Sequence, residues 1–179
     1  MDSETVNYLN NVARFLKVEP GKIITDEDYL LRRTKNNSVT KGFINIILQF
    51  LDESQSEYCL KHNINAVINT QIWQWLEYCI VYAAQAKSHQ SIHQILKELN
   101  AILKLKTYLV SNKLTIADIV LYYILYGLMC NLTPIEKEVY LNVSRWFDNI
   151  QQDGRIRQTN KLVNFSCNYI INSVASLHI

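Results

Sequence analysis

Apolar residues recur at helical spacing through most of the chain, and this periodicity restricts the fold more than any other feature. Between residues 66 and 86, and again between 88 and 103, isoleucine, leucine and aromatic residues stand three or four positions apart. The 179 residues include only four glycines and two prolines, so the chain has few of the residues that make tight turns. Turn-rich sandwiches, barrels and glycine-loop nucleotide folds are therefore disfavoured, and a mainly α-helical protein is predicted.

The overall composition indicates a folded domain that needs no cross-links. Apolar residues make up 49% and charged residues 19% of the chain, which excludes intrinsic disorder. The length allows one compact domain or a small domain fused to a larger one, with a core that needs neither disulfides nor metals. The net charge of +2 is too small to indicate a nucleic-acid partner by itself.

The first third of the chain has a mixed pattern. We predict, in order, a helix over 3–16, two short strand candidates at 22–24 and 29–32, a polar loop containing Arg32, Arg33, Lys35, Asn36 and Asn37, a helix over about 39–51, and a polar linker over 52–63. This alternation of helix and short strands is too brief for a complete β-α-β-α-β-β-α unit.

The rest of the chain is predicted to be almost entirely helical, and two helix starts carry caps. Thr115 and Asp118 are spaced as a capping box at the start of an apolar helix that runs to about Cys130. That helix contains Asp118 and is shorter than the ~20 residues a membrane span needs, so it is predicted to be a buried core helix. Thr133-Pro134-Ile135-Glu136 is a second cap, and a last helix is predicted from about 158 to 174.

One helix, predicted over 135–151, has two distinct sides. Its core side is predicted to carry Ile135, Val139, Val143, Trp146, Phe147 and Ile150. At about 100° per residue, the opposite side carries Leu141, Arg145, Asp148 and Gln152. That side is either an ordinary solvent face or a protein interface, and arginine is enriched at interface hot spots.

Several chemically active residue types are present without a complete catalytic or metal-binding pattern. His89 and His93 stand four positions apart, yet neither an acidic residue nor a third histidine supports a metal site. The four cysteines form no CxxC pair and are predicted to be reduced. Two basic clusters are predicted to be solvated loops, although either could contact phosphate: Arg32, Arg33, Lys35 and Lys41, and Arg155, Arg157 and Lys161.

Three motifs together resemble one protein family. They are QWLEY at residues 74–78, LTIADIVLYY at 114–123 and EKEVYLNVSRWFDNIQ at 136–151, followed by GRIRQ at 154–158. The combination resembles the glutathione-transferase-like auxiliary subunits of the multi-aminoacyl-tRNA synthetase complex, whereas the first 60 residues match weakly. The resemblance implies a mainly α fold, with a reduced thioredoxin-like α/β piece over 1–60 and an all-helical glutathione-transferase C-terminal-like domain over 65–179.

The resemblance also implies a function: a non-catalytic scaffold in translation that uses two surfaces. One is the helix of Arg145, with Leu141, Asp148 and Gln152 beside it, which would bind glutamyl-prolyl-tRNA synthetase. The other corresponds to the dimer surface of glutathione transferases and would bind methionyl-tRNA synthetase. Its candidates are Phe43, Ile47, Phe50, Ile68 and Trp73, whose apolar character could equally place them in the core. Other glutathione-transferase-like subunits of the complex are further expected partners.

Two other functions stay open at this point. A divergent glutathione transferase would need a tyrosine, serine or cysteine after the first strand and a cis-proline before the third, whereas Tyr8 falls in a helical pattern. An RNA-binding accessory protein would use the basic clusters, although sequence-specific nucleic-acid binding is not expected. We expect no cofactor, no metal and no membrane association. The absence of a signal peptide favours the cytoplasm, and the resemblance adds the nucleus.

Overall fold

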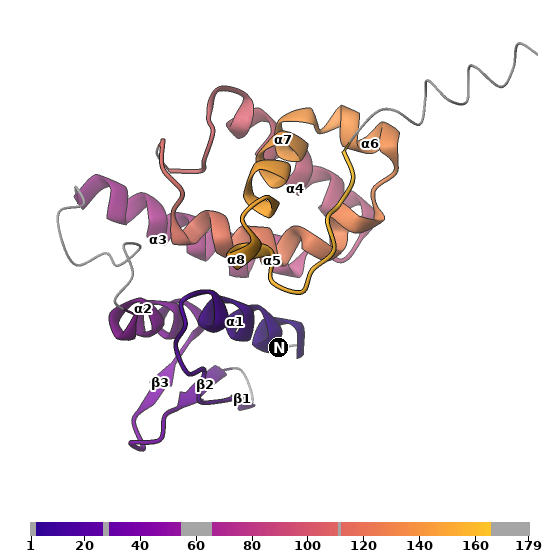
Figure 1. Cartoon of the computed structure of the whole chain (residues 1–179). Coiled ribbons are helices and arrows are strands. Elements are labelled where there is room, and N and C mark those ends of the chain that lie inside the picture. The colour runs from indigo at the N-terminus through magenta and orange to yellow at the C-terminus, as the bar shows by residue number, and fades with distance from the viewer. Residues whose placement is uncertain (1–2, 27–28, 55–65, 111, 166–179) are drawn as a thin grey trace, which may run out of the picture.

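The computed structural model describes residues 3–26, 29–54, 66–110 and 112–165 (Figure 1). Its elements are α1 (Ser3–Phe15), β1 (Lys22–Asp26), β2 (Tyr29–Arg33), β3 (Val39–Lys41), α2 (Phe43–Glu53), α3 (Ala66–Val81), the 3-10 turn η1 (Ala83–Gln85), α4 (His89–Ile102), the 3-10 turn η2 (Leu103–Leu105), α5 (Ile116–Asn131), α6 (Pro134–Val139), α7 (Leu141–Gln151) and α8 (Gly154–Arg157). The prediction of a mainly helical protein with a small N-terminal sheet is confirmed.

Helix α5 is the centre of the helical half. Its sequence is apolar on all sides, and such a helix is stable only when other elements surround it. It contacts α1, α3 and α7, and nearly every side chain from Ile116 to Leu125 is buried. The prediction of a buried core helix is therefore confirmed. Among the described residues, no helix is both long and apolar enough to cross a membrane.

The N-terminal piece contains a three-stranded antiparallel sheet in the order β1-β2-β3, with α1 and α2 together on one side of it (Figure 1). Both predicted strands are present, but the third, β3, was predicted to be the start of a helix. Val39 pairs with Arg33 and Lys41 with Leu31, so the cross-strand partner decides the local structure. Gly42 separates β3 from α2. Its φ of 90° would be costly for any residue with a side chain, which explains why a glycine occupies this position.

The predicted helix over 135–151 is two helices, α6 and α7, and this changes which side chains are buried. Tyr140 joins them with φ −100° and ψ 45°, so the helical phase is reset at that residue. Val143, Trp146, Phe147 and Ile150 are buried as predicted. The prediction that Ile135 and Val139 lie in the core is wrong: both are more than half exposed, at 69% and 60%.

The prediction of a last helix starting near residue 158 is also wrong for the described residues. Only the four-residue α8 is helical in this region. Residues 159–165 come after α8 and have no helical structure. The side chain of Gln151 explains this path, because it bonds both main-chain groups of Val163: its amide donates to the Val163 carbonyl (2.8 Å) and its oxygen accepts from the Val163 N–H (2.9 Å). Residues 166–174 of the predicted helix lie outside the described residues.

The predicted boundary between a domain at 1–60 and one at 65–179 falls near residues 55–65, which the structure does not describe, so it stays a prediction. The two halves are in direct contact elsewhere. Gln158, the last residue of the GRIRQ motif, donates to the Asn11 carbonyl and to the Tyr123 hydroxyl, both at 2.8 Å. Its oxygen accepts from Arg14 at 2.9 Å. One side chain thus joins α1 to α5.

Replacing Gln158 with alanine is expected to destabilise the protein by about 1–2 kcal/mol, because the two hydrogen bonds that join the halves are lost together with the bond to Tyr123. The measurement is urea denaturation followed by circular dichroism. Gln152→Ala is the matched control: this exposed glutamine bonds only Asp148 on its own helix, and we expect a change within about 0.5 kcal/mol. Equal losses in both variants would show that Gln158 does not join the halves.

Candidate partner-binding surfaces

Asp118 determines how α7 is placed against α5. Its Oδ2 accepts bonds from the Thr115 N–H (3.0 Å) and the Thr115 hydroxyl (2.8 Å), which confirms the predicted capping box. Its Oδ1 accepts two bonds that the sequence did not reveal: the Leu109 N–H at 2.9 Å and the indole N–H of Trp146 at 3.0 Å. A single buried carboxylate therefore joins the start of α5, the segment before it and α7.

The electrostatics of Asp118 result from two opposed effects. Burial raises the pKa of its carboxyl above the ordinary value, because desolvation disfavours the charged form. The four donated hydrogen bonds lower that pKa and so reduce the rise. Both oxygens accept hydrogen bonds from within the chain. This carboxylate therefore stabilises the position of α7 and is inaccessible to a partner.

The outer side of α7 holds the predicted interface residues. Leu141 is 64% exposed, and Arg145 and Gln152 are exposed as well. Asp148 is half-buried and accepts from the amides of Gln151 (2.7 Å) and Gln152 (3.0 Å). The helical arithmetic placed these four residues correctly on the side opposite the core. Whether they contact a partner remains a prediction.

Arg145 is held in place by the main chain of a neighbouring turn. Its Nη2 donates to the carbonyls of Leu103 (2.7 Å) and Lys106 (2.9 Å), at the end of α4 and η2. Between these two residues, Leu105 is 92% exposed. Sequence reasoning missed Leu105, because the turn that brings it beside α7 is a tertiary contact. We call Leu105, Leu141, Arg145, Asp148 and Gln152 the α7 surface.

The predicted dimer-like surface is only partly accessible. Phe43, Ile47 and Phe50 are at most 4% exposed, so the prediction that they contact a partner is wrong. Helix α2 lies between the sheet and the helical half (Figure 1). The three side chains belong to the hydrophobic core cluster. Their apolar character belongs to the core.

Helix α3 carries the accessible part of that surface. Ile68 is half-buried against the core, whereas Trp73 is 42% exposed. Counting on by four from Trp73 reaches Glu77 and then Val81, both of which are exposed. These three residues form one stripe, which we call the α3 surface.

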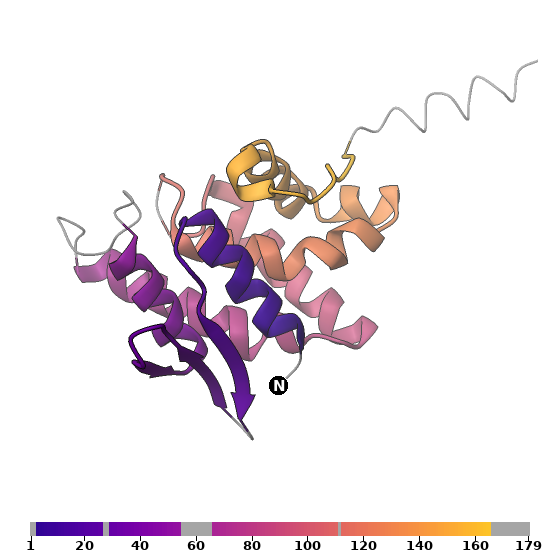
Figure 2. The ribbon, with the colours of Figure 1, turned by 60° about the horizontal axis from the view of Figure 1, so that its bottom comes forward.

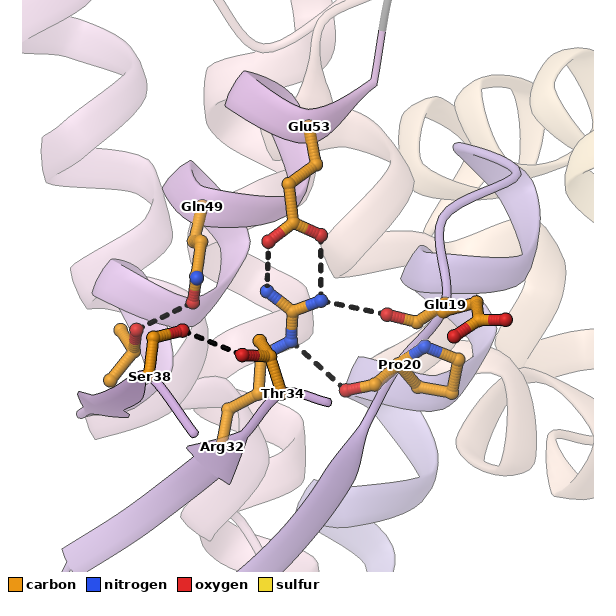
Figure 3. A network of polar contacts seen from close by, with 8 residues as sticks. Glu19, Pro20, Arg32, Thr34, Ser38, Gln49 and Glu53 are labelled. Atoms are coloured by element: carbon orange, nitrogen blue, oxygen red, sulfur yellow. Dashed lines mark hydrogen bonds and ion pairs between the residues drawn. The ribbon is translucent and has the colours of Figure 1, made fainter. Parts of the chain in front are cut away.

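The first basic cluster is solvated in part: Arg33, Lys35 and Lys41 are exposed as predicted, whereas the prediction for Arg32 is wrong because Arg32 is buried. It belongs to β2 and points inward (Figure 3). Its Nη1 and Nη2 donate to the two oxygens of Glu53 at 2.6 and 2.7 Å. Its Nη2 and Nε also donate to the main-chain carbonyls of Glu19 (2.7 Å) and Pro20 (3.0 Å), respectively. The guanidinium also lies 4.5 Å from the centre of the Phe50 ring, so Arg32 cannot contact phosphate.

The second basic cluster is largely engaged within the chain. Arg155 pairs with Asp153 at 2.7 Å, and its hydrogen bonds lower the pKa of that carboxyl. Arg157 donates to the Gln151 carbonyl at 2.9 Å. Lys161 is exposed. Two of the three cations therefore already bond groups within the chain.

The two helical histidines line a cleft of about 980 Å³ between α1, α4 and α5. Within it, His93 contacts the Tyr140 hydroxyl through Nδ1. The described residues contain no group of three potential metal ligands. Tyr8 also lines this cleft, but it lies on α1 and not after a strand. No described peptide bond is cis.

Comparison with solved structures defines the class of protein. A delta-class glutathione transferase of Nilaparvata lugens superposes with a TM-score of 0.68 over 87% of each chain, at 12% identity. A chain from the yeast aminoacyl-tRNA synthetase sub-complexes superposes with a TM-score of 0.59 over 98% of this chain and 93% of the other, at 17% identity. The fold is that of a glutathione-transferase-like protein with a small N-terminal sheet.

Sequence comparison identifies the family within that class. Human eukaryotic translation elongation factor 1 epsilon-1 is 40% identical over 126 residues, which are 70% of this chain and 71% of the human protein. The chain belongs to the eukaryotic translation elongation factor 1 epsilon-1 family. The Cricetulus griseus bifunctional glutamate/proline–tRNA ligase is 32% identical over 143 residues, 79% of this chain and 9% of the ligase. Residues 69–154 match the family model described as nuclear-export cofactor Arc1p.

Proposed function

We propose that the protein is a non-catalytic scaffold of an aminoacyl-tRNA synthetase complex that holds two glutathione-transferase-like domains at once. The α7 surface binds the domain of glutamyl-prolyl-tRNA synthetase, and the α3 surface binds that of methionyl-tRNA synthetase. The role belongs to translation in the cytoplasm, with the nucleus as a second location. Family membership and the likeness to a chain of yeast synthetase sub-complexes support this assignment.

The observation that carries the proposal is the preorganised Arg145. Two main-chain carbonyls hold its guanidinium, so little side-chain entropy remains to be lost when a partner binds. Leu141, four positions earlier on α7, and Leu105, in the turn that Arg145 bonds, provide exposed apolar area. Interface hot spots commonly consist of an arginine surrounded by apolar residues.

The α3 surface offers a different chemistry. Trp73 supplies a large, rigid aromatic side chain, Val81 adds apolar area, and Glu77 lies between them. Helix α5 contacts both α3 and α7 and lies between them (Figure 1). Two surfaces on different helices allow a linear chain of subunits, whereas one self-complementary surface closes as a dimer.

A divergent glutathione transferase is the second candidate, and the cleft beside Tyr8 and the likeness to a glutathione transferase structure favour it. Retention on glutathione resin and turnover of an electrophilic substrate distinguish it from a scaffold. RNA binding would now depend on Lys22, Arg33, Lys35 and Lys41, because Arg32 is buried. A steep salt dependence of RNA affinity would support it.

Arg145→Ala is expected to weaken binding of the glutamyl-prolyl-tRNA synthetase domain by at least about 30-fold, equivalent to about 2 kcal/mol. Binding of the methionyl-tRNA synthetase domain should stay unchanged. The measurement is size-exclusion chromatography with light scattering, on the protein mixed with each isolated domain and with both. Trp73→Ala should weaken binding of the methionyl-tRNA synthetase domain and leave binding of the glutamyl-prolyl-tRNA synthetase domain unchanged.

The matched control is Arg155→Ala, which removes another exposed arginine outside both surfaces. It should leave the ternary complex intact. Absence of a complex with either domain would refute the scaffold. Loss of both partners in Arg145→Ala with an unchanged melting temperature would refute the assignment of one partner to each surface.

A further inference from the structure

The side of the N-terminal sheet that faces away from α1 and α2 has no covering element among the described residues (Figure 2). Strand register determines which side chains lie there. Lys22 pairs with Arg33, Ile24 with Leu31, Leu31 with Lys41, and Arg33 with Val39. Directly paired residues project to the same side of a sheet. We call Lys22, Ile24, Tyr29, Leu31, Arg33, Val39 and Lys41 the outer sheet face.

Burial confirms this division of the sheet. Leu30 and Arg32 are 1% exposed, and Ile23 packs against the core. The alternate residues differ: Tyr29 is 63% and Val39 48% exposed, and Arg33 is exposed as well. Ile24 and Leu31, at the centre of the outer sheet face, are half-buried but are not part of the core cluster. One side of the sheet is therefore packed against the core, and the other side is open with apolar residues at its centre.

Three of the four charged residues that the strand register places on this face are basic, and Asp26, which pairs with Tyr29 at the end of β1, is the acidic one. Lys22, Arg33 and Lys41 are exposed, and within the described residues no ion pair joins any of them. Three cations on one face repel a second copy of the same face and attract acidic groups. The aliphatic centre favours a protein ligand over RNA, whose phosphates would gain nothing from Ile24 and Leu31.

We propose that the outer sheet face binds an acidic amphipathic helix of another protein. The dimensions match, because a five-residue strand spans about 17 Å and a helix of about 11 residues has the same length. The apolar stripe of the helix covers Ile24, Leu31 and Val39. Its flanking carboxylates pair with Lys22, Arg33 and Lys41. This site is separate from the α3 and α7 surfaces and does not depend on the proposed scaffold.

The test uses the full chain and a fluorescently labelled helical peptide of about 14 residues, with leucine at helical spacing and glutamate on both flanks. Fluorescence anisotropy should show saturable binding that weakens with salt. A peptide with every glutamate changed to lysine should bind at least about tenfold more weakly. Methyl chemical shifts of Ile24, Leu31 and Val39 should change on titration with the acidic peptide.

The decisive variant reverses three charges: Lys22→Glu, Arg33→Glu and Lys41→Glu. All three residues are exposed, so the fold should persist by circular dichroism, while peptide affinity should fall at least about tenfold. The control carries the same total charge change on exposed lysines elsewhere, at Lys97, Lys104 and Lys161, and should change affinity less than about twofold.

Equal affinity for the acidic and the lysine-substituted peptide would overturn the proposal, as would equal losses in the two triple variants. Tighter binding of an unstructured RNA oligonucleotide than of the acidic peptide, lost in the Lys22, Arg33 and Lys41 variant, would assign the face to nucleic acid and also overturn it. Leu31→Ser should weaken peptide binding without changing any charge, since the helix would lose its central apolar contact.

Discussion

Replacing Asp118 with alanine is expected to destabilise the protein by about 3–5 kcal/mol, because it removes the acceptor of four buried hydrogen bonds at once. The Asp118 carboxylate accepts from the Leu109 N–H, the Thr115 N–H and hydroxyl, and the Trp146 indole. Alanine leaves these buried donors without partners and also removes the box that begins α5. Urea denaturation followed by tryptophan fluorescence measures the loss.

Two comparison variants distinguish the buried network from an ordinary cap. Asp118→Asn keeps one accepting oxygen but turns an amide NH₂ toward some of the four donors. Its loss of unfolding free energy should therefore be smaller than that of Asp118→Ala but greater than zero. Glu136→Ala removes the matching residue of the exposed capping box on α6 and should cost about 1 kcal/mol or less. A cost for Asp118→Ala no larger than that for Glu136→Ala would contradict the central role of Asp118.

Arg32→Met is expected to cost about 3–5 kcal/mol, because it breaks a bidentate ion pair within the N-terminal piece. Arg32 bonds both oxygens of Glu53 and the carbonyls of Glu19 and Pro20. Methionine keeps an unbranched apolar side chain over Phe50 but satisfies none of these acceptors. The free energy of unfolding from urea denaturation is the measurement.

The adjacent residue provides the control for Arg32. Arg33→Met removes the same charge from the exposed side of the same strand and should change stability by about 0.5 kcal/mol or less. Adding Glu53→Met to Arg32→Met should cost less than the sum of the two single variants, since the second change removes an acceptor that the first left without its partner. Equal effects of the Arg32 and Arg33 variants would show that burial of Arg32 contributes nothing.

The predicted helices that were correct depend on short-range signals. The periodicity of α1, α3 and α4 and the caps at Thr115 and Thr133 all act within one or two helical turns. These signals can be read from neighbouring residues alone. The three errors, at β3, at the α6–α7 junction and after α8, share a different cause. In each, a distant partner bonds the main chain: β2 pairs with Val39–Lys41, the Asn100 side chain accepts from the Asn142 N–H at the start of α7, and the Gln151 side chain bonds Val163.

The same division applies to the candidate surfaces. Helical arithmetic placed Leu141, Arg145 and Gln152 on the exposed side of α7, because the angle between residues on one helix is constant. It could not find Leu105, which reaches α7 through the turn after α4. Nor could it separate Phe43, Ile47 and Phe50 from a dimer surface, because an apolar side chain has the same periodicity whether a core or a partner covers it.

The sequence by itself determined the helical class, the capped start of the central helix and the family to which the chain belongs. These properties follow from local spacing and from motifs a few residues long. Only the tertiary structure decided that Arg32 lies inside while Arg33 lies outside, and that no described element covers one side of the sheet. Adjacent residues of a strand point to opposite sides, and which side becomes the interior depends on where α1 and α2 pack, since burial is a property of the assembled elements.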